Sequence, residues 1–403
     1  MRHRRWVFYI LAIVILPGEL FALGVRIADQ DPFATARGNA FSATADNPSA
    51  IYYNPAGITQ LEGLNARVGV YAITLGSTYT APNGTKHDTR DEFDALPQLY
   101  ATYAVADLPL SVGLGLYAPY GLGLEWPDDT GFRTLAKEGR ITYLTFNPVI
   151  AWKVLPTLSI AAGPTVNYSQ AKLTYGLLPS PGIGDQFAFK GDDTAPGFNA
   201  GVMWQLHPKV SVGATYRSET TLHYDGHSSI SGLPPLNGSQ EASAGFHFPR
   251  NIIGGLSYRP STNWNFEVDV DWTDWDSLNT VTLKQASGNL ALPFNWRSSF
   301  FYEAGATYYF GAGYRASAGY IYSENSVPDT SFSPGVPDSD RHIFSLGMGR
   351  RYKEWSWDAA YQLAWGPSRT VTGSPTSPTS GESANGRYEF ISHALTISLG
   401  YTF

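Results

Sequence analysis

The sequence predicts an all-β fold, a closed transmembrane antiparallel β-barrel of about 14 strands whose lumen is plugged by an N-terminal hatch. Three observations lead to this prediction. Apolar and polar residues alternate with a period of two through almost all of the chain after residue 65. The connections between the alternating segments are short and long in turn. The last segment ends on an aromatic residue at the C-terminus, Phe403.

The composition excludes several classes of protein. The chain has 403 residues, no cysteine and a formal net charge of −7. Without cysteine there is no disulfide scaffold and no thiol chemistry. An acidic balance with no basic cluster beyond the N-terminus argues against a nucleic-acid partner. No linker or change in composition divides the chain after residue 65, so one large β-structure fits better than the two or three soluble domains that the length suggests.

Residues 1–22 are expected to be a secretory signal peptide. Arginines near the start precede a short apolar core, Trp6 to Leu16, and Ala22 offers a cleavage site. The apolar core is too short to span a membrane comfortably, and no other stretch approaches about 18 uninterrupted apolar residues. We therefore predict an exported chain of the outer membrane of a Gram-negative-type bacterium, without a transmembrane helix.

The connections fall into two groups that alternate strictly. Short turns are expected at 106–109, 155–157, 207–209, 259–263, 311–313 and 352–354. Long polar connections are expected near 80–92, 122–139, 177–193, 225–240, 284–296, 324–339 and 367–386. This alternation is typical of an outer-membrane barrel, in which short turns face the periplasm and long loops face outward.

Single strands carry one apolar and one polar face. Within 264–272 the even positions are Trp, Phe or Val, whereas the odd positions include Glu267, Asp269 and Asp271. Successive side chains of a strand point to opposite faces, so the apolar set should face lipid and the carboxylates the lumen. Like charges on one face require cations, and we interpret them as lumenal charge pairing that seats the hatch. The candidate partners are Arg26, Arg37, Arg217 and Arg297.

The C-terminal strand predicts several partners. Apolar residues occupy every second position from Leu395 to Phe403. An alternating strand that ends on an aromatic residue resembles the signal that outer-membrane assembly machinery recognises, so we expect this machinery to bind Phe403. Outer-membrane lipid and lipopolysaccharide would surround the barrel. A closed barrel leaves no sheet edge to satisfy, so a monomer is expected.

The residues between the signal peptide and the first strand have the composition of a plug. The stretch 38–61 is small, polar and rich in turn-forming residues, without strand or helix periodicity. A barrel of about fourteen strands is too wide for wall side chains to fill. The apolar residues Ile51, Tyr52 and Tyr53 require burial. We therefore predict a hatch over residues 23–64 and a barrel over residues 65–403.

The third strand, which starts near Leu110, carries a break signal at Pro119, Tyr120 and Gly121. Proline has no N–H for the ladder, and glycine weakens a strand. We expect a kink at 118–121 that leaves a lateral opening in the wall. The alternative is that Pro119 only begins the following loop.

The stretch GNAFSATADNPSAIYYNPAGITQLEG resembles the N-terminal region of the FadL family of outer-membrane transporters of hydrophobic compounds. An asparagine-proline-alanine motif marks the hatch of that family and is matched by Asn54, Pro55 and Ala56. Residues 250–277 and 302–352 resemble the later strands of the family. The resemblance implies passive uptake of long-chain fatty acids or related hydrophobic compounds, without a cofactor. It also implies movement from the outer loops to a pocket beside the hatch and out through the kinked third strand.

Candidate ligand contacts lie on the outer part of the chain. Leu177, Leu178 and Phe187 could collect a hydrophobic solute or could only pack the loops together. Lys172 could bind a fatty-acid carboxylate or could be a solvated charge. The family pattern has an arginine where Gln170 stands, so an uncharged alkane or aromatic compound remains the alternative cargo.

Two other functions remain as alternatives. A general porin for polar solutes would not use its N-terminus as a plug. A lipid-acting enzyme would need a Ser–His constellation, and no nucleophile motif such as G-x-S-x-G is present. His223 and His227 on a strand would be about 13 Å apart, too far to share a metal ion. We therefore predict no catalytic residue, no metal and no cofactor.

Overall fold

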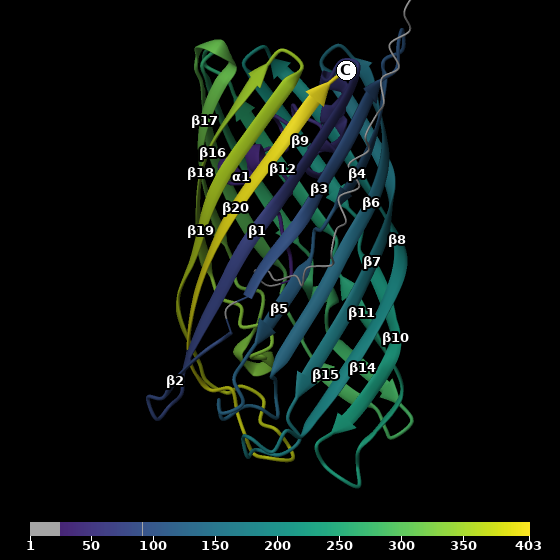
Figure 1. The fold of residues 1–403 in the computed structure, drawn as a ribbon. Coiled ribbons are helices and arrows are strands. Elements are labelled where there is room, and N and C mark those ends of the chain that lie inside the picture. The colour runs from purple at the N-terminus through teal and green to yellow at the C-terminus, as the bar shows by residue number, and fades with distance from the viewer. Residues whose placement is uncertain (1–24, 91) are drawn as a thin grey trace, which may run out of the picture.

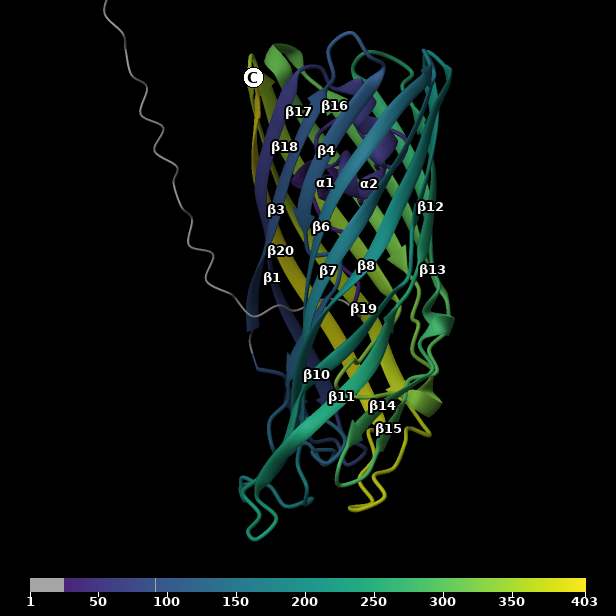
Figure 2. The ribbon, with the colours of Figure 1, turned by 90° about the vertical axis from the view of Figure 1, so that its right-hand side faces the viewer.

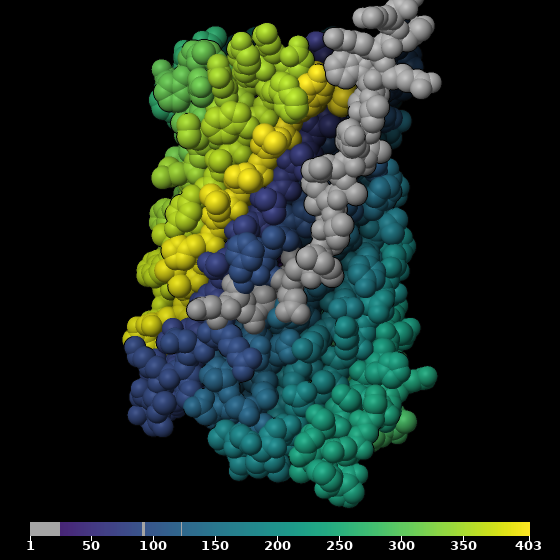
Figure 3. Space-filling view, viewed as in Figure 1, coloured from purple at the N-terminus to yellow at the C-terminus, as the bar shows by residue number. Residues whose placement is uncertain are grey.

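The computed structural model describes residues 25–90 and 92–403, and the predicted signal peptide, residues 1–22, lies outside them. Over the described residues the chain forms a closed antiparallel barrel of 14 strands, which confirms the predicted fold (Figure 1). The barrel closes because β1 (Leu64–Thr80) pairs with β20 (Gly386–Thr402) along its length. Figure 3 shows the two strands side by side on the outer surface.

The wall contains continuous and interrupted strands. The other continuous strands are β3 (Glu92–Ala104), β6 (Glu138–Leu155), β7 (Leu158–Tyr175), β8 (Gln186–His207), β17 (Tyr314–Ser323), β18 (Arg341–Tyr352) and β19 (Trp355–Val371). The interrupted strands are β4 (Leu110–Tyr117) with β5 (Gly121–Glu125), β9 (Val210–Arg217) with β10 (Thr220–Ser231), β11 (Gly238–Phe248) with β12 (Asn251–Tyr258), β13 (Trp264–Thr273) with β14 (Thr280–Gln285), and β15 (Leu290–Pro293) with β16 (Ser299–Tyr309). The short β2 (Lys86–Asp88) pairs only with the outer end of β1.

The predicted short turns all connect neighbouring strands at one end of the barrel, where the C-terminus also lies (Figure 1). The long connections lie at the other end, and several of them are shorter than predicted; β8, for example, already begins at Gln186, within the loop expected over 177–193. The loop expected over 225–240 is mostly strand, because β10 and β11 remain paired as far as Ile230 and Gly238. In the region expected as a loop over 284–296, β14 and β15 pair with each other. Polar sequence there reflects strands with a water-exposed face rather than irregular loops.

The part of the wall that surrounds the hatch has the predicted orientation of its two faces. On β13 the side chain of Val268 is 55% exposed on the outside, whereas that of Glu267 is 2% exposed on the inside. An apolar outer face is what lipid requires, and a polar inner face requires partners in the lumen. The residues before β1 supply those partners.

Residues before β1 lie inside the barrel near its short-turn end, as Figure 2 shows for α1 (Pro32–Ala36) and α2 (Ala50–Tyr53). From Val25 to Thr59 every residue except Asp46 is buried. The side chain of Asp31 caps α1, and a short helix η1 (Pro55–Gln60) follows α2. The remaining short helices, η2 (Trp275–Ser277), η3 (Gly311–Gly313) and η4 (Asp329–Ser331), lie in connections. In the described part of the chain no helix is long and apolar enough to cross a membrane.

Candidate functional site

The wall is incomplete beside the third strand. β3 pairs with β4 only over Leu99–Ala104, and the described residues show no ladder partner on that side for Phe93–Gln98. β5 forms its ladder with β6, and the interruption between β4 and β5 covers Ala118–Tyr120. Pro97 lies in the unpaired part of β3, where a missing N–H is tolerated. We refer to the space between Phe93–Gln98 and β5 as the wall gap.

The N-terminal segment of the hatch, Val25–Gln30, binds the backbone at the kink. The N–H of Ile27 donates to the carbonyl of Pro119 at 2.8 Å, and the N–H of Gly121 donates to the carbonyl of Val25 at 2.9 Å. The side-chain amide of Gln30 bonds both backbone groups of Ala118. Unpaired backbone groups are costly in a bilayer, so this segment takes the place of a missing strand.

The same segment fills the wall gap with an apolar side chain. Ile27 packs in one buried cluster with Leu96 of β3 and Ala118 at the kink. The backbone contacts and this side chain close the gap together. Opening the gap therefore requires the N-terminal segment to move.

Arg26 connects this segment to the opposite wall. Its guanidinium forms a buried ion pair with Asp271 and donates to the hydroxyl of Thr273 at 2.7 Å. It also lies over the ring of Phe301, with 5.3 Å between the guanidinium carbon and the ring centroid. Arg26 thus spans the lumen from the kink to β13.

The other two lumenal carboxylates also bind the hatch. Glu267 accepts the N–H groups of Ala43 and Thr44 and pairs with Arg37 at 3.2 Å. Asp269 accepts the N–H groups of Phe41 and Ser42 at 3.1 and 2.9 Å. All three carboxylates on the inner face of β13 therefore contact the plug.

Two of the four cations expected to pair with these carboxylates do not pair with them. Arg26 and Arg37 are partners, because the hatch brings both beside β13. Arg217 instead donates to the carbonyl of Tyr52 at 3.0 Å. Arg297 is exposed just before β16, beyond the level of the carboxylates. Sequence spacing alone did not separate the four, because the choice depends on how the hatch folds.

The Asn54–Pro55–Ala56 motif joins the hatch to β8. The side-chain N–H groups of Asn54 donate to the carbonyls of Ser42 at 2.7 Å and Val202 at 2.9 Å. Its side-chain oxygen accepts the N–H of Ala56 and caps η1. Gly201 of the wall lies so close to Asn54 that a side chain there would collide with it.

Between the hatch and the long outer loops, the two faces of the wall exchange their polarity. Aromatic and aliphatic side chains point inward and are buried: Phe189, Tyr224, Phe246 and Leu283. Their exposed neighbours on the outer face are Lys190, His223, His227, Glu241 and Lys284. A polar outer face indicates that this part of the barrel stands in water, and its lumen is apolar.

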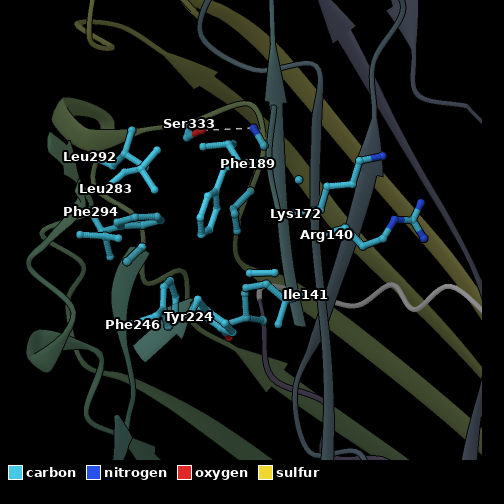
Figure 4. A pocket seen from close by; sticks show the side chains of 18 of the residues that line it. Arg140, Ile141, Lys172, Phe189, Tyr224, Phe246, Leu283, Leu292, Phe294 and Ser333 are labelled. Atoms are coloured by element: carbon cyan, nitrogen blue, oxygen red, sulfur yellow. Dashed lines mark hydrogen bonds between the residues drawn. The ribbon is translucent and has the colours of Figure 1, made fainter. Parts of the chain in front are cut away.

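An apolar pocket of about 120 Å³ lies in this part of the lumen. Figure 4 shows Ile141, Phe189, Tyr224 and Phe246 pointing into it from different strands. Val25 lines the pocket with its side chain, while its own carbonyl binds the kink. The pocket and the wall gap are therefore connected through a single residue of the hatch.

Aromatic residues close the lumen on the outer-loop side of the pocket. The ring of Phe132 packs on Tyr79 and Trp126 at centroid distances of 4.8 and 5.4 Å. The indole N–H of Trp126 donates to the carbonyl of Pro334 at 2.8 Å, which holds the connection 324–340 over the pocket. Entry from outside requires these outer loops to separate.

Arg133 and Asp185 tie two outer loops together. The guanidinium of Arg133 donates to the carboxylate of Asp185 at 3.1 Å. Burial raises the pKa of Asp185, but the amides of Leu178 and Leu177 and the charge of Arg133 lower it more, so this pKa lies below its ordinary value. The ionised form of Asp185 therefore stabilises the closed loops.

Lys172 does not place its charge in the pocket. Figure 4 shows the side chains of Lys172 and Arg140 pointing away from the cavity. The ammonium group of Lys172 pairs with Glu138 at 2.6 Å on the outer face. Gln170, two residues earlier on the same strand, shares that outward orientation. Of the two alternatives for Lys172, this geometry favours a charge on the outer face over a partner for a ligand carboxylate.

The predicted apolar contacts lie next to the pocket but do not line it. Phe187 is buried and stacks on Tyr175 at 4.8 Å, one inward position beyond Phe189. Leu177 packs against the same core cluster, and Leu178 is exposed at the surface. Sequence analysis missed most of the lining, because several of these residues, such as Phe189 and Phe294, lie in stretches that were expected to be long polar loops. The charged residues between them, such as Lys190, were the available signal.

A membrane barrel closed by its own N-terminal residues, with an apolar pocket beside a break in its wall, defines the class of plugged outer-membrane transport proteins. Residues 14–403 match the family described as outer membrane protein transport protein (OMPP1/FadL/TodX), and the chain belongs to that family. It is therefore a protein of the outer membrane.

Individual relatives are distant. A long-chain fatty acid transport protein of Escherichia coli O6:H1 is 23% identical over 85% of this chain and 87% of its own length. The crystal structure of a Pseudomonas aeruginosa FadL homologue covers 96% of this chain and 100% of its own, with a TM-score of 0.81 and 20% identity. The crystal structure of the Pseudomonas putida toluene transporter TodX covers 95% of this chain and 100% of its own, with a TM-score of 0.76 and 16% identity. These similarities to structures concern the fold.

Proposed function

We propose that this protein takes up hydrophobic compounds passively, from the apolar pocket through the wall gap into the membrane. The observation that carries the proposal is the double role of Val25. Its side chain lines the pocket, and its carbonyl holds Gly121 at the kink. A ligand that displaces Val25 would release the segment that closes the gap. No energy source or cofactor enters this route.

The pocket favours an uncharged cargo. Apolar protein cavities of about 150 Å³ take up benzene, so a pocket of similar size suits one aromatic ring or a short length of alkyl chain. No cation points into the pocket among its described lining residues, because Lys172 and Arg140 face outward. A single-ring or alkane hydrocarbon therefore fits as it stands. The named activity of the TodX structure, toluene transport, agrees with this cargo.

Long-chain fatty acids are the second candidate. The relative from Escherichia coli is named for this cargo. A long acyl chain would have to continue from the pocket toward the hatch, past the ring cluster of Tyr120, Tyr143 and Phe248. An anchor for its carboxylate would then lie deeper in the lumen than Lys172.

The alternatives receive less support. A general porin would need an open polar lumen, whereas the hatch is buried within the barrel from Val25 to Thr59. Three histidines of the described chain hydrogen-bond hydroxyls of Thr221, Tyr320 and Tyr361, which are not serine nucleophiles. We further propose a monomer in contact with outer-membrane lipid and lipopolysaccharide. Its exposed C-terminal Phe403 would be recognised by the assembly machinery.

A reversible lock tests the route. Arg26 and Tyr120 face each other in an antiparallel bridge flanked by two hydrogen bonds, a geometry with about 4.5 Å between Cα atoms, within the range of a disulfide. The chain has no cysteine, so Arg26→Cys with Tyr120→Cys creates a single possible bond. We expect oxidised double-variant protein to stop uptake of radiolabelled toluene by vesicles and reduced protein to restore it. Each single cysteine variant is the control. Uptake that is equal in both redox states would exclude this route.

A further inference from the structure

Glu303 is a buried carboxyl group that has no partner in the described chain. It lies on the inner face of β16, and only 4% of its surface is exposed. No hydrogen bond or ion pair joins it to a described residue. The charged groups around it are Asp271, Asp269, Arg26 and Asp29. An ionised carboxylate in a low-dielectric interior is unfavourable unless a counter-charge or a proton neutralises it.

The residues opposite Glu303 on the neighbouring strands are a carboxylate and an apolar side chain. On one side, β13 places Asp269 directly opposite it, and Asp271 follows two residues later on the same face. On the other side, β17 places Ile321 opposite it. Directly opposed residues of an antiparallel pair have Cβ atoms about 5 Å apart, so Asp269 and Glu303 repel each other when both are ionised.

The hatch adds one cation and one further carboxylate to this set. Arg26 is already paired with Asp271. Asp29 is bound by two side-chain amides, at 2.9 and 2.8 Å. Arg37 is paired with Glu267 and so serves a different carboxylate. Arg26 is therefore shared by four carboxylates, and three negative charges stay unbalanced if all of them are ionised: Asp29, Asp269, Asp271 and Glu303.

Glu303 is the carboxyl group of this set that suits a proton. Asp269 accepts two backbone N–H groups of the hatch, and Asp271 is paired with Arg26, and both arrangements favour the ionised form. Glu303 has neither kind of donor among the described residues. The Oδ1 atom of Asp271 is buried, and no described group donates to it. A proton on Glu303 would remove its own charge and supply an O–H donor to a neighbouring carboxylate.

We infer that Glu303 holds a proton at neutral pH and donates a hydrogen bond to a carboxylate of β13, so that the seat of the hatch is a proton-binding site. Loss of this proton adds a negative charge beside Asp271 and competes for Arg26, whose neighbours Val25 and Ile27 bind the kink. A glutamate in water ionises at about pH 4.3, so the closed barrel binds more protons than one whose hatch has moved away. Closure is therefore firm at low pH and weakens as the pH rises. The proton site does not depend on the cargo, and only its effect on the wall gap rests on the proposed function.

Infrared spectroscopy tests the proton directly, because a protonated carboxyl group and a carboxylate have separate C=O stretching bands. The purified full chain in detergent is titrated from about pH 6 to about pH 10, where ordinary carboxyl groups are already ionised. We expect the wild type to show a protonated band that weakens as the pH rises. Glu303→Gln should lack this band, because its amide keeps a donor and has no such proton to lose. The matched control Glu241→Gln, at an exposed position of β11, should retain the band.

Conductance in planar bilayers tests the effect of this proton on the hatch. Coupled release of one proton should raise the basal conductance of the wild type by up to about tenfold per pH unit, until the infrared band has disappeared. Glu303→Gln should give one low conductance throughout this range, and Glu241→Gln should follow the wild type. Absence of the band from the wild type, or its persistence in Glu303→Gln, overturns the proton site. A wild-type conductance as independent of pH as that of Glu303→Gln overturns the role of the proton in closure, whereas the cysteine lock tests uptake separately.

Discussion

The guanidinium of Arg26 forms an ion pair with the carboxylate of Asp271 across the lumen, between residues 245 positions apart in the chain. Both side chains are almost completely buried. The backbone beside Arg26 completes the kink, and Asp271 belongs to the opposite wall. The pair therefore anchors the segment that closes the wall gap.

Removal of the charge on Asp271 should loosen this closure. Breaking one partner of a buried ion pair costs about 3–5 kcal/mol, and Asp271→Asn leaves Arg26 without its counter-ion. We expect a higher basal conductance in planar bilayers and a lower midpoint of unfolding in urea. The exposed Asp192→Asn, on the outer face of β8, is the control. A conductance equal to that of the wild type would show that the pair does not hold the gap closed.

Wall glycines make room for the hatch, so a methyl group at one of them should displace it. A Cβ at Gly319 would collide with the backbone of Arg37 and Gly38, whereas one at Gly254 has nothing within 4 Å. Overpacking a rigid contact costs about 1–3 kcal/mol. Gly319→Ala should therefore increase permeation of small solutes into vesicles, and Gly254→Ala should not. Equal permeation in the two variants would contradict the tight seating of the hatch.

The outer loops should open at acid pH through Asp185. Its folded-state pKa is lowered, so ionised Asp185 stabilises the closed loops above its unfolded pKa of about 3.9, and this stability is lost as the pH falls through the folded value. We expect the protection of amides 177–185 from exchange, measured relative to the intrinsic rate at each pH, to stay high at neutral pH and to fall only below about pH 3.9. Asp185→Asn should exchange faster already at neutral pH, unlike Asp129→Asn, whose side chain is 65% exposed. Protection independent of both pH and Asp185 would exclude the lock.

Lys172 should contribute little to ligand binding. Its ammonium is partly exposed and paired with Glu138 on the outer face, and such pairs contribute about 0–1 kcal/mol. Lys172→Gln is expected to leave the Kd for palmitate within about twofold of the wild type, by calorimetry on purified protein. A tenfold loss of affinity would instead place this cation at the ligand.

Much of the fold is readable from local sequence. The strands around the hatch follow a local rule, the alternation of residues such as Val268 and Glu267. The reason is that lipid requires every outward side chain to be apolar. The kink signal at Pro119 is local as well, since proline removes a ladder hydrogen bond wherever it stands. The pocket could not be predicted in this way. Between the hatch and the outer loops, apolar side chains such as Phe189 point into the lumen and polar ones such as Lys190 point outward, the opposite of the rule for a wall in lipid.

The sequence by itself determined the number of strands, the end of the barrel at which the short turns lie, and the presence of a plug. Period, turn composition and length are properties of neighbouring residues. Only the tertiary structure decided that Arg26 and Arg37 pair with the carboxylates of β13 and that Arg217 does not. It also decided that Lys172 faces outward. The physical reason is that a hatch without periodicity has no register with the wall until it is enclosed, so its partners depend on contacts between residues far apart in the chain.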